Sequence, residues 1–161
     1  MSLYLTGNKT VTQSGTPMTT VEIYTGEAQT CPFTWTNASG TAINLTGWTF
    51  ATSIKYYTCN TTYSNLTTVD VEDLVELSPQ PNGITDVSVG TLDQATHTGQ
   101  GWLYIPSDLT GGAGSPATPI LTVADSVTYI CIITMTVTNT NSISGKTDIS
   151  RLPIGIIVRY Q

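Results

Sequence analysis

The sequence is poor in charge. Of its 161 residues, 10% are Asp, Glu, Lys or Arg, whereas about 25% is typical of globular proteins. The 5 basic residues stand against 11 acidic ones, which gives a formal net charge of −6. This balance argues against binding to the phosphate backbone of nucleic acids and against docking on anionic lipid. No apolar run approaches the roughly 20 residues that span a bilayer. We therefore expect no nucleic acid and no membrane among the partners.

Side chains that carry chemistry are also few. His97 is the single histidine, so a Ser-His-Asp or Cys-His site would have to use it, and its turn-like surroundings contain no nucleophile elbow. Cys31, Cys59 and Cys131 are odd in number and show no C-x-x-C spacing. A disulfide framework and a zinc site are therefore both unexpected. We expect a protein that is not an enzyme, with free thiols, no metal and no cofactor.

An acidic cluster at Asp70, Glu72, Asp73 and Glu76 is the remaining candidate for metal binding. It lacks the glycine-spaced pattern of a calcium loop, so a solvated acidic face is favoured. A glycosidase would need two carboxyl groups roughly 5 to 9.5 Å apart, and the sequence singles out no such pair. A polysaccharide-cleaving enzyme stays open as an alternative.

The abundant residues favour β-structure. About a fifth of the chain is threonine, and threonine, valine, isoleucine and the aromatics suit a pleated sheet. Apolar residues alternate with polar ones far more often than they recur at helical spacing, which predicts strands. The expected strands are 27–36, 47–57, 84–92, 101–106, 126–138 and 149–160, with one more inside 59–78. The sequence thus predicts an all-β fold, an antiparallel sandwich of about seven to nine strands.

The alternation also predicts which side chains face the core. The more apolar side of each expected strand supplies Phe33, Trp35, Trp48, Phe50, Ile54, Tyr129, Cys131, Ile133 and Met135. The three tryptophans, Trp35, Trp48 and Trp102, could instead form a platform on which sugars stack. Core packing is favoured, because all three lie inside alternating runs. Solvent exposure of Trp48 and Trp102 would distinguish the two interpretations.

Two resemblances bear on the fold. The segment from Asp125 to Cys131 resembles strand F of immunoglobulin variable domains, with a tyrosine two residues before the cysteine. Together with Cys31 and Trp48 it suggests an immunoglobulin-like sandwich. The number of residues between Trp48 and Cys131 is too large for that family, so only the sandwich architecture is retained.

The second resemblance covers roughly residues 20–160. The segments 22–27, 31–35 and 40–57 are similar to the opening of the Ig-like β-sandwich modules of tailed-phage baseplate and tail-fibre proteins, and 101–109 with 127–137 resembles their second half. The resemblance implies a bacteriophage virion structural protein of the tail, baseplate or neck. It would assemble in the bacterial host cytoplasm, by contacts with other virion proteins and with copies of itself as a homo-oligomer. A capsid decoration protein and a carbohydrate-binding or adhesin sandwich are the alternatives.

Two segments are expected to make these contacts. We predict a single sandwich domain at 21–161, preceded at 1–20 by an N-terminal arm or extra strand. The turn at 139–145 ends a strand of about 40 Å, at about 3.3 Å per residue, so its tip is expected to project and to pair edge to edge. The predicted contact residues are Leu3, Tyr4, Leu5, Asn139, Thr140, Asn141 and Ser142.

Overall fold

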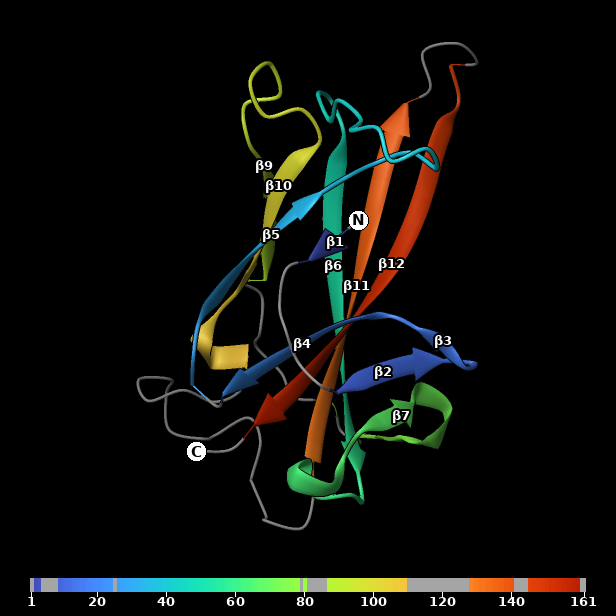
Figure 1. The fold of residues 1–161 in the computed structure, drawn as a ribbon, viewed down its shortest axis with the longest axis vertical. Coiled ribbons are helices and arrows are strands. Elements are labelled where there is room, and N and C mark those ends of the chain that lie inside the picture. Colours follow the sequence, from blue (N-terminus) through green and yellow to red (C-terminus); the bar gives the residue numbers. More distant parts are fainter. Residues whose placement is uncertain are drawn as a thin grey trace.

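The computed structural model describes residues 2–3, 9–24, 26–78, 80, 87–109, 128–140 and 145–159. The described part of the chain is all-β and contains no α-helix, as predicted (Figure 1). Its strands are β1 (Ser2–Leu3), β2 (Thr10–Gln13), β3 (Thr16–Pro17), β4 (Thr19–Tyr24), β5 (Gln29–Thr34), β6 (Thr49–Cys59), β7 (Thr68–Asp70), β8 (Val75–Glu76), β9 (Ser88–Thr91), β10 (Gln100–Ile105), β11 (Thr128–Thr140) and β12 (Thr147–Arg159). Three short 3₁₀ helices connect them: η1 (Tyr63–Asn65), η2 (Val71–Asp73) and η3 (Ser107–Leu109).

The strands form three sheets in layers. A five-stranded sheet of order β4-β12-β11-β6-β8 lies in the middle. A four-stranded sheet, β1-β5-β10-β9, packs on one of its faces, and a three-stranded sheet, β3-β2-β7, packs on the other. Figure 1 shows β6, β11 and β12 running along most of the molecule, whereas β2, β3 and β7 lie beside their lower half.

The first core lies between the four-stranded and five-stranded sheets. Cys31, Leu103 and Ile105 come from one sheet, and Cys131 and Ile133 come from the other. The predicted inner face is confirmed: four of its members are buried, and the other five are half-buried against this cluster. Ring pairs link the two sheets near the upper end, namely Phe33 with Phe50 and Trp35 with Trp48, with centroids 6.2 and 5.8 Å apart.

The second core lies under the three-stranded sheet and was not foreseen. Val11 of β2 and Val69 of β7 pack on Ile130, Ile132 and Ile157 of the five-stranded sheet. The close approach depends on Gly155 of β12, where an added Cβ would lie 2.9 Å from the Val11 side chain. Residues 10–20, part of the segment 1–20 expected as an arm or an extra strand, therefore include two short strands, the first two residues of β4 and a fully buried valine.

Two details of the predicted sandwich are wrong. The expected seven to nine strands are exceeded, because several segments contribute strands of two residues. Two of the three sheets are mixed and not purely antiparallel, since β4 runs parallel to β12 and β2 runs parallel to β7. Both parallel pairs join strands far apart in the sequence. Alternation within a strand fixes which side chains share a face, but it carries no information on the direction of a distant partner.

A buried glutamine joins the loops at the upper end. Gln94 is 8% exposed, and its Oε1 accepts hydrogen bonds from the N–H groups of Leu45 and Gly99 at 3.0 and 2.8 Å. Its Nε2 donates to the carbonyls of Leu92 and Gln100 at 2.8 and 2.9 Å. A buried amide with all these bonds made costs little to bury and holds two loops in one arrangement.

Candidate functional site

The end of the β11–β12 hairpin carries the predicted contact residues that the structure places best. Asn139 and Thr140 pair with Asp148 and Thr147 in the last steps of the ladder. Asn139 is half-buried, and Thr140 is exposed together with residues 145–151 of the returning chain. These strand ends therefore offer backbone and side chains to solvent.

The other predicted contact residues are placed only in part. The backbone of Leu3 pairs with Phe33, which makes β1 an edge strand of the four-stranded sheet. It does not lie beside the hairpin end in the sheet order, because the hairpin belongs to the five-stranded sheet. The rest lie outside the described residues: Tyr4, Leu5, Asn141 and Ser142.

Above the three-stranded sheet, the outer face of the five-stranded sheet is uncovered by any described segment. Thr134, Thr136 and Thr138 run along β11 in the middle of this area and are half-buried. Their cross-strand neighbours are Ser53, Ala51 and Thr49 on β6 and Pro153, Arg151 and Ile149 on β12. We call these nine positions the open face. It is a flat β-surface of mostly small, uncharged side chains, with Ile149 56% exposed at its border.

The open face ends at a free sheet edge. Strand β4 pairs with β12 from Ile154 onward, so no described strand pairs with the edge of β12 at 149–153. Such an edge presents unpaired N–H and C=O groups on which another strand can add. Arg151 and Pro153 lie on it, and charge and proline at an edge limit indiscriminate pairing.

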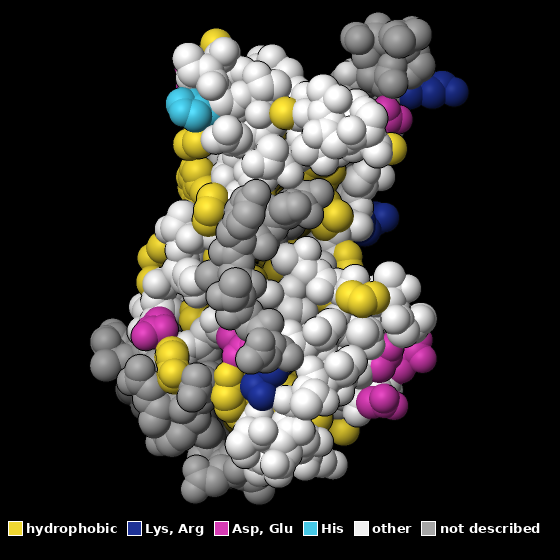
Figure 2. All heavy atoms as spheres, viewed as in Figure 1, with side chains coloured by type: hydrophobic (Ala, Val, Ile, Leu, Met, Phe, Trp, Pro, Cys, Tyr) yellow, Lys and Arg dark blue, Asp and Glu magenta, His cyan; other side chains and the backbone are white. Residues whose placement is uncertain are grey.

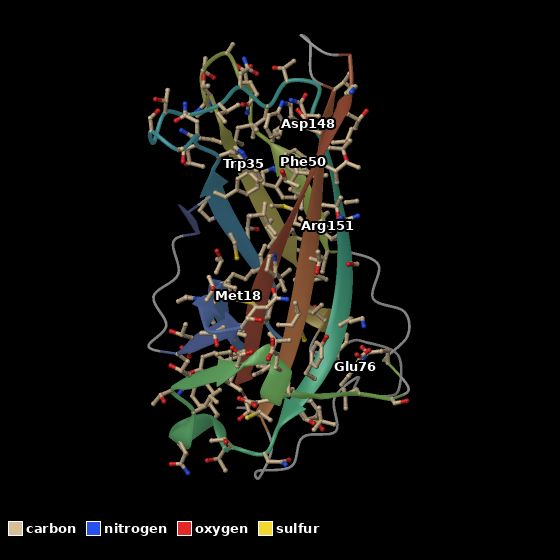
Figure 3. The ribbon with its side chains drawn as sticks, turned by 90° about the vertical axis from the view of Figure 1, so that its right-hand side faces the viewer. Met18, Trp35, Phe50, Glu76, Asp148 and Arg151 are labelled. Atoms are coloured by element: carbon tan, nitrogen blue, oxygen red, sulfur yellow. The ribbon has the colours of Figure 1, made fainter. Side chains whose placement is uncertain are left out.

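A groove of about 490 Å³ separates the open face from the three-stranded sheet. Figure 3 shows Arg151 higher along the long strands than Met18, which belongs to the segment before β4. The lining residues are Gln13, Met18, Ser53, Ile54, Lys55, Tyr57, Val71, Ile132, Thr134, Arg151 and Pro153. The groove thus combines an apolar floor with two of the chain's five basic residues.

Electrostatics at the groove are simple. Lys55 pairs with Glu76 at 3.2 Å, and both side chains are about half exposed. The hydrogen bond that Lys55 donates to Glu76, and the negative charge of Glu76, raise the pKa of Lys55 above its usual value. Arg151 makes no ion pair with any described residue. An exposed cation is therefore available at the groove of a net acidic protein.

In the structure, Asp70 of the acidic cluster stabilises the β2–β3 turn through hydrogen bonds. Asp70 Oδ2 accepts hydrogen bonds from the Gly15 N–H and the Thr12 hydroxyl, both at 2.8 Å. Oδ1 accepts from the N–H of Glu72 at 3.1 Å and of Ser14 at 3.3 Å. These bonds, the one from Gly15 most of all, lower the pKa of Asp70 from 3.8 to about 2. They fix the β2–β3 turn, in which Ser14 and Gly15 have positive φ. In the space-filling view, acidic side chains gather on the side of this sheet (Figure 2).

Groups that catalysis would need are not assembled in the described part of the chain. His97 is exposed in a loop, with Nδ1 2.8 Å from the Thr96 hydroxyl. All three cysteines are free and buried, and burial raises the pKa of the Cys31 thiol to about 11 and that of Cys131 further. Such thiols are poor nucleophiles because the thiolate is the reactive form. No group of three or more His, Cys, Asp or Glu among the described residues could hold a metal ion.

A second surface, on the outer face of the four-stranded sheet, contains one of the three tryptophans for which core packing was favoured. Trp35 and Trp48 pack against the first core as predicted. Trp102 does not: it lies with Tyr104 on the outer face of the four-stranded sheet, half-buried, because Leu103 and Ile105 take the inner positions of β10. The signal was present in the Trp-Leu-Tyr-Ile alternation, where both faces are apolar and only one can face the core.

The comparisons with known proteins add no assignment. Within the described residues no helix has the length and apolar character needed to cross a membrane. A scan against protein-family models and a search of curated proteins both found no match to this chain.

Proposed function

We propose that the chain is a non-enzymatic structural protein of a bacteriophage virion, of the tail, baseplate or neck, that acts through protein–protein contacts. The observation that carries the proposal is the open face with its free β12 edge. A flat, low-charge β-surface bordered by an unpaired strand suits strand addition and face packing by a neighbouring subunit. The assignment to a phage virion rests on the resemblance to phage Ig-like modules.

The arrangement of the sheets supports an Ig-like module at the centre of the fold. Cys31 and Cys131 lie in opposite sheets and are both fully buried in the first core, as the equivalent pair does in an Ig-type sandwich. In this proposal the three-stranded sheet is an addition that covers half of the outer face. The uncovered half is where a neighbour docks.

Charge distribution supports contacts with copies of the same chain. The groove contains Arg151, and Glu72 and Asp73 are exposed on η2. Arg151 of one copy can pair with these carboxylates of another, which favours contacts between copies. Other virion proteins of acidic surface fit the same groove.

The first test is whether the chain is in particles. Mass spectrometry of purified virions of the phage that encodes it is expected to find the protein at a fixed copy number. Absence from purified particles overturns the proposed function.

The second test addresses the surface. Sedimentation of the full chain over a range of concentrations is expected to show self-association, which Ile149→Lys weakens by roughly tenfold or more by placing a charge at the free edge. Val75→Lys is the matched control, because Val75 is 59% exposed and Ile149 is 56% exposed, and Val75 lies on β8 at the opposite edge of the same sheet. An equal effect of both variants, or of neither, contradicts the assignment of the contact to the β12 edge.

A further inference from the structure

The outer face of the four-stranded sheet carries a second, independent surface. Strand β10 runs through the middle of this sheet, and register places its two outward aromatic residues between small side chains of β5 and β9. One cross-strand row is Pro32, Trp102 and Gly90, and the next is Thr30, Tyr104 and Ser88. We call these six residues the aromatic platform. None of them is charged, and all are at least partly exposed.

Gly90 determines how Trp102 lies. An added Cβ at Gly90 would be 2.2 and 2.4 Å from two atoms of the indole ring, closer than any side chain tolerates. The ring therefore occupies the space above β9 that a side chain of that strand would otherwise fill. Glycine within a strand is typical of a site where a ring or ligand must approach the backbone closely. The indole is spread across two strands instead of standing out from the sheet.

The platform borders a shallow, open pocket of about 410 Å³. This volume is in the lower part of the roughly 300 to 1,000 Å³ range of small-molecule sites. Its lining residues are Thr30, Ser88, Trp102 and Tyr104. Apolar ring surface is thus combined with three hydroxyl groups that both donate and accept hydrogen bonds.

We propose that the aromatic platform binds a neutral glycan, with one pyranose ring stacked on Trp102 and its hydroxyls bonded by Thr30, Ser88 and Tyr104. The C–H groups on one face of a pyranose are complementary to the negative face of an indole. Hydroxyl groups around that face match the hydroxyl partners on the sheet. This site goes beyond the proposed structural role and does not depend on it.

The chemistry of the platform favours a sugar over other occupants. A protein partner normally buries about 800 Å² on each side around a packed apolar centre, and two aromatic rings among hydroxyls form a much smaller apolar patch. An anionic ligand finds no cation on the platform and meets a net charge of −6. A proline-rich peptide also docks on aromatic grooves. It has few hydrogen-bonding groups for the three hydroxyls of the platform, whereas a sugar has many.

The test uses the full chain with maltohexaose, cellohexaose and a galactose-rich oligosaccharide as neutral probes, and a sialylated oligosaccharide and a proline-rich peptide as competing classes. Binding is followed by isothermal titration and by the ¹H–¹⁵N signals of the three indoles. At least one neutral probe is expected to bind in the millimolar range or tighter and to shift the Trp102 signal alone. Failure of all neutral probes, or preference for the acidic probe or the peptide, overturns the proposal.

Variants separate binding from folding. Trp102→Ala is expected to reduce affinity by roughly tenfold or more, while Trp102→Phe retains part of it. Gly90→Ala keeps the tryptophan but displaces the ring, so it should also lose affinity. Leu92→Ala is the control, because Leu92 is 40% exposed just after β9 and lies outside the platform. If Trp102→Ala fails to fold, Thr30→Val and Tyr104→Phe test the same site. Unchanged affinity in the folded platform variants overturns the proposal.

Discussion

The two halves of β11 differ in a way that explains the layers of the fold. From Tyr129 to Ile133 every residue is apolar, and from Thr134 to Thr140 threonine or asparagine alternates with the buried Met135 and Val137. The apolar half lies between two cores, since Cys131 and Ile133 face one and Ile130 and Ile132 face the other. In the alternating half, only the inner face is covered by described residues.

Strand β12 repeats the contrast at the same level. Its lower half, from Ile154 to Val158, is apolar throughout and buried. Its upper half, from Thr147 to Pro153, mixes charged and polar residues with two apolar ones and is largely exposed. Because Pro153 pairs with Thr134, the change of pattern falls at one cross-strand position. A continuous apolar run marks a strand covered on both faces, and alternation marks a strand covered on one.

The largest expected difference between the halves comes from truncating outward side chains of β11. Ile130→Ala removes a fully buried side chain from the second core and should lower the free energy of unfolding by about 2 to 5 kcal/mol. Thr136→Ala, on the same face of the open half, should cost less than about 1 kcal/mol, mostly through lost β-propensity. Urea unfolding of both variants measures this. Equal losses would mean that the outer face is covered along its whole length.

The sequence predicted the long strands and the first core well. The alternation of β5, β6 and β11 places the right residues inward, because a strand with one core face must repeat every two residues. The third layer could not be predicted in this way. Its strands contribute few buried apolar residues, Val11 and Val69 among them, and such short segments carry no recognisable period.

The candidate surfaces were predicted less completely. The projecting hairpin tip was inferred from strand length and stays a prediction, because residues 141–144 lie outside the described residues. The open face did not follow, because a row of threonines has the same pattern whether it faces water or a neighbour. A platform was the less favoured interpretation of the tryptophans, because Trp102 lies inside an alternating run as core residues do. The pairing of Trp102 with Gly90 and the burial of Leu103 show that Trp102 lies on the outer face of β10.

A second prediction concerns the contact that holds the three-stranded sheet down. Gly155→Ala introduces a Cβ 2.9 Å from Val11 and should cost about 1 to 3 kcal/mol by overpacking. Val11→Ala removes the opposing methyl groups and creates a cavity, so it also destabilises on its own. The double variant is expected to be more stable than the sum of the two losses predicts. Additive losses in urea unfolding would show that β2 does not rest on Gly155.

A third prediction is that acid weakens the attachment of the three-stranded sheet through Asp70. Because the folded pKa of Asp70 is about 2 and its ordinary value is 3.8, its carboxylate stabilises the fold above pH 3.8 and loses this contribution as the pH falls through 2. Asp70→Asn should therefore be less stable than the parent at pH 5, with the difference shrinking towards pH 2. Asp73→Asn removes a neighbouring exposed carboxylate that does not hold the turn, and it serves as the control. A difference that stays constant from pH 5 to pH 2 would contradict this role for Asp70.

The smallest effect is expected at the ion pair of Lys55 with Glu76. Lys55 and Glu76 lie beside the groove at the boundary of the two halves, but both are widely exposed, so water and salt screen their attraction. The raised pKa of Lys55 stabilises the fold below its usual value of 10.5 and is lost as the pH rises through the folded value. Near neutral pH, Lys55→Gln should leave the urea midpoint unchanged at both low and high salt, and Glu76→Gln should do the same. A loss comparable with that of Ile130→Ala would mean that charge at the boundary, and not apolar cover, distinguishes the two halves of the long strands.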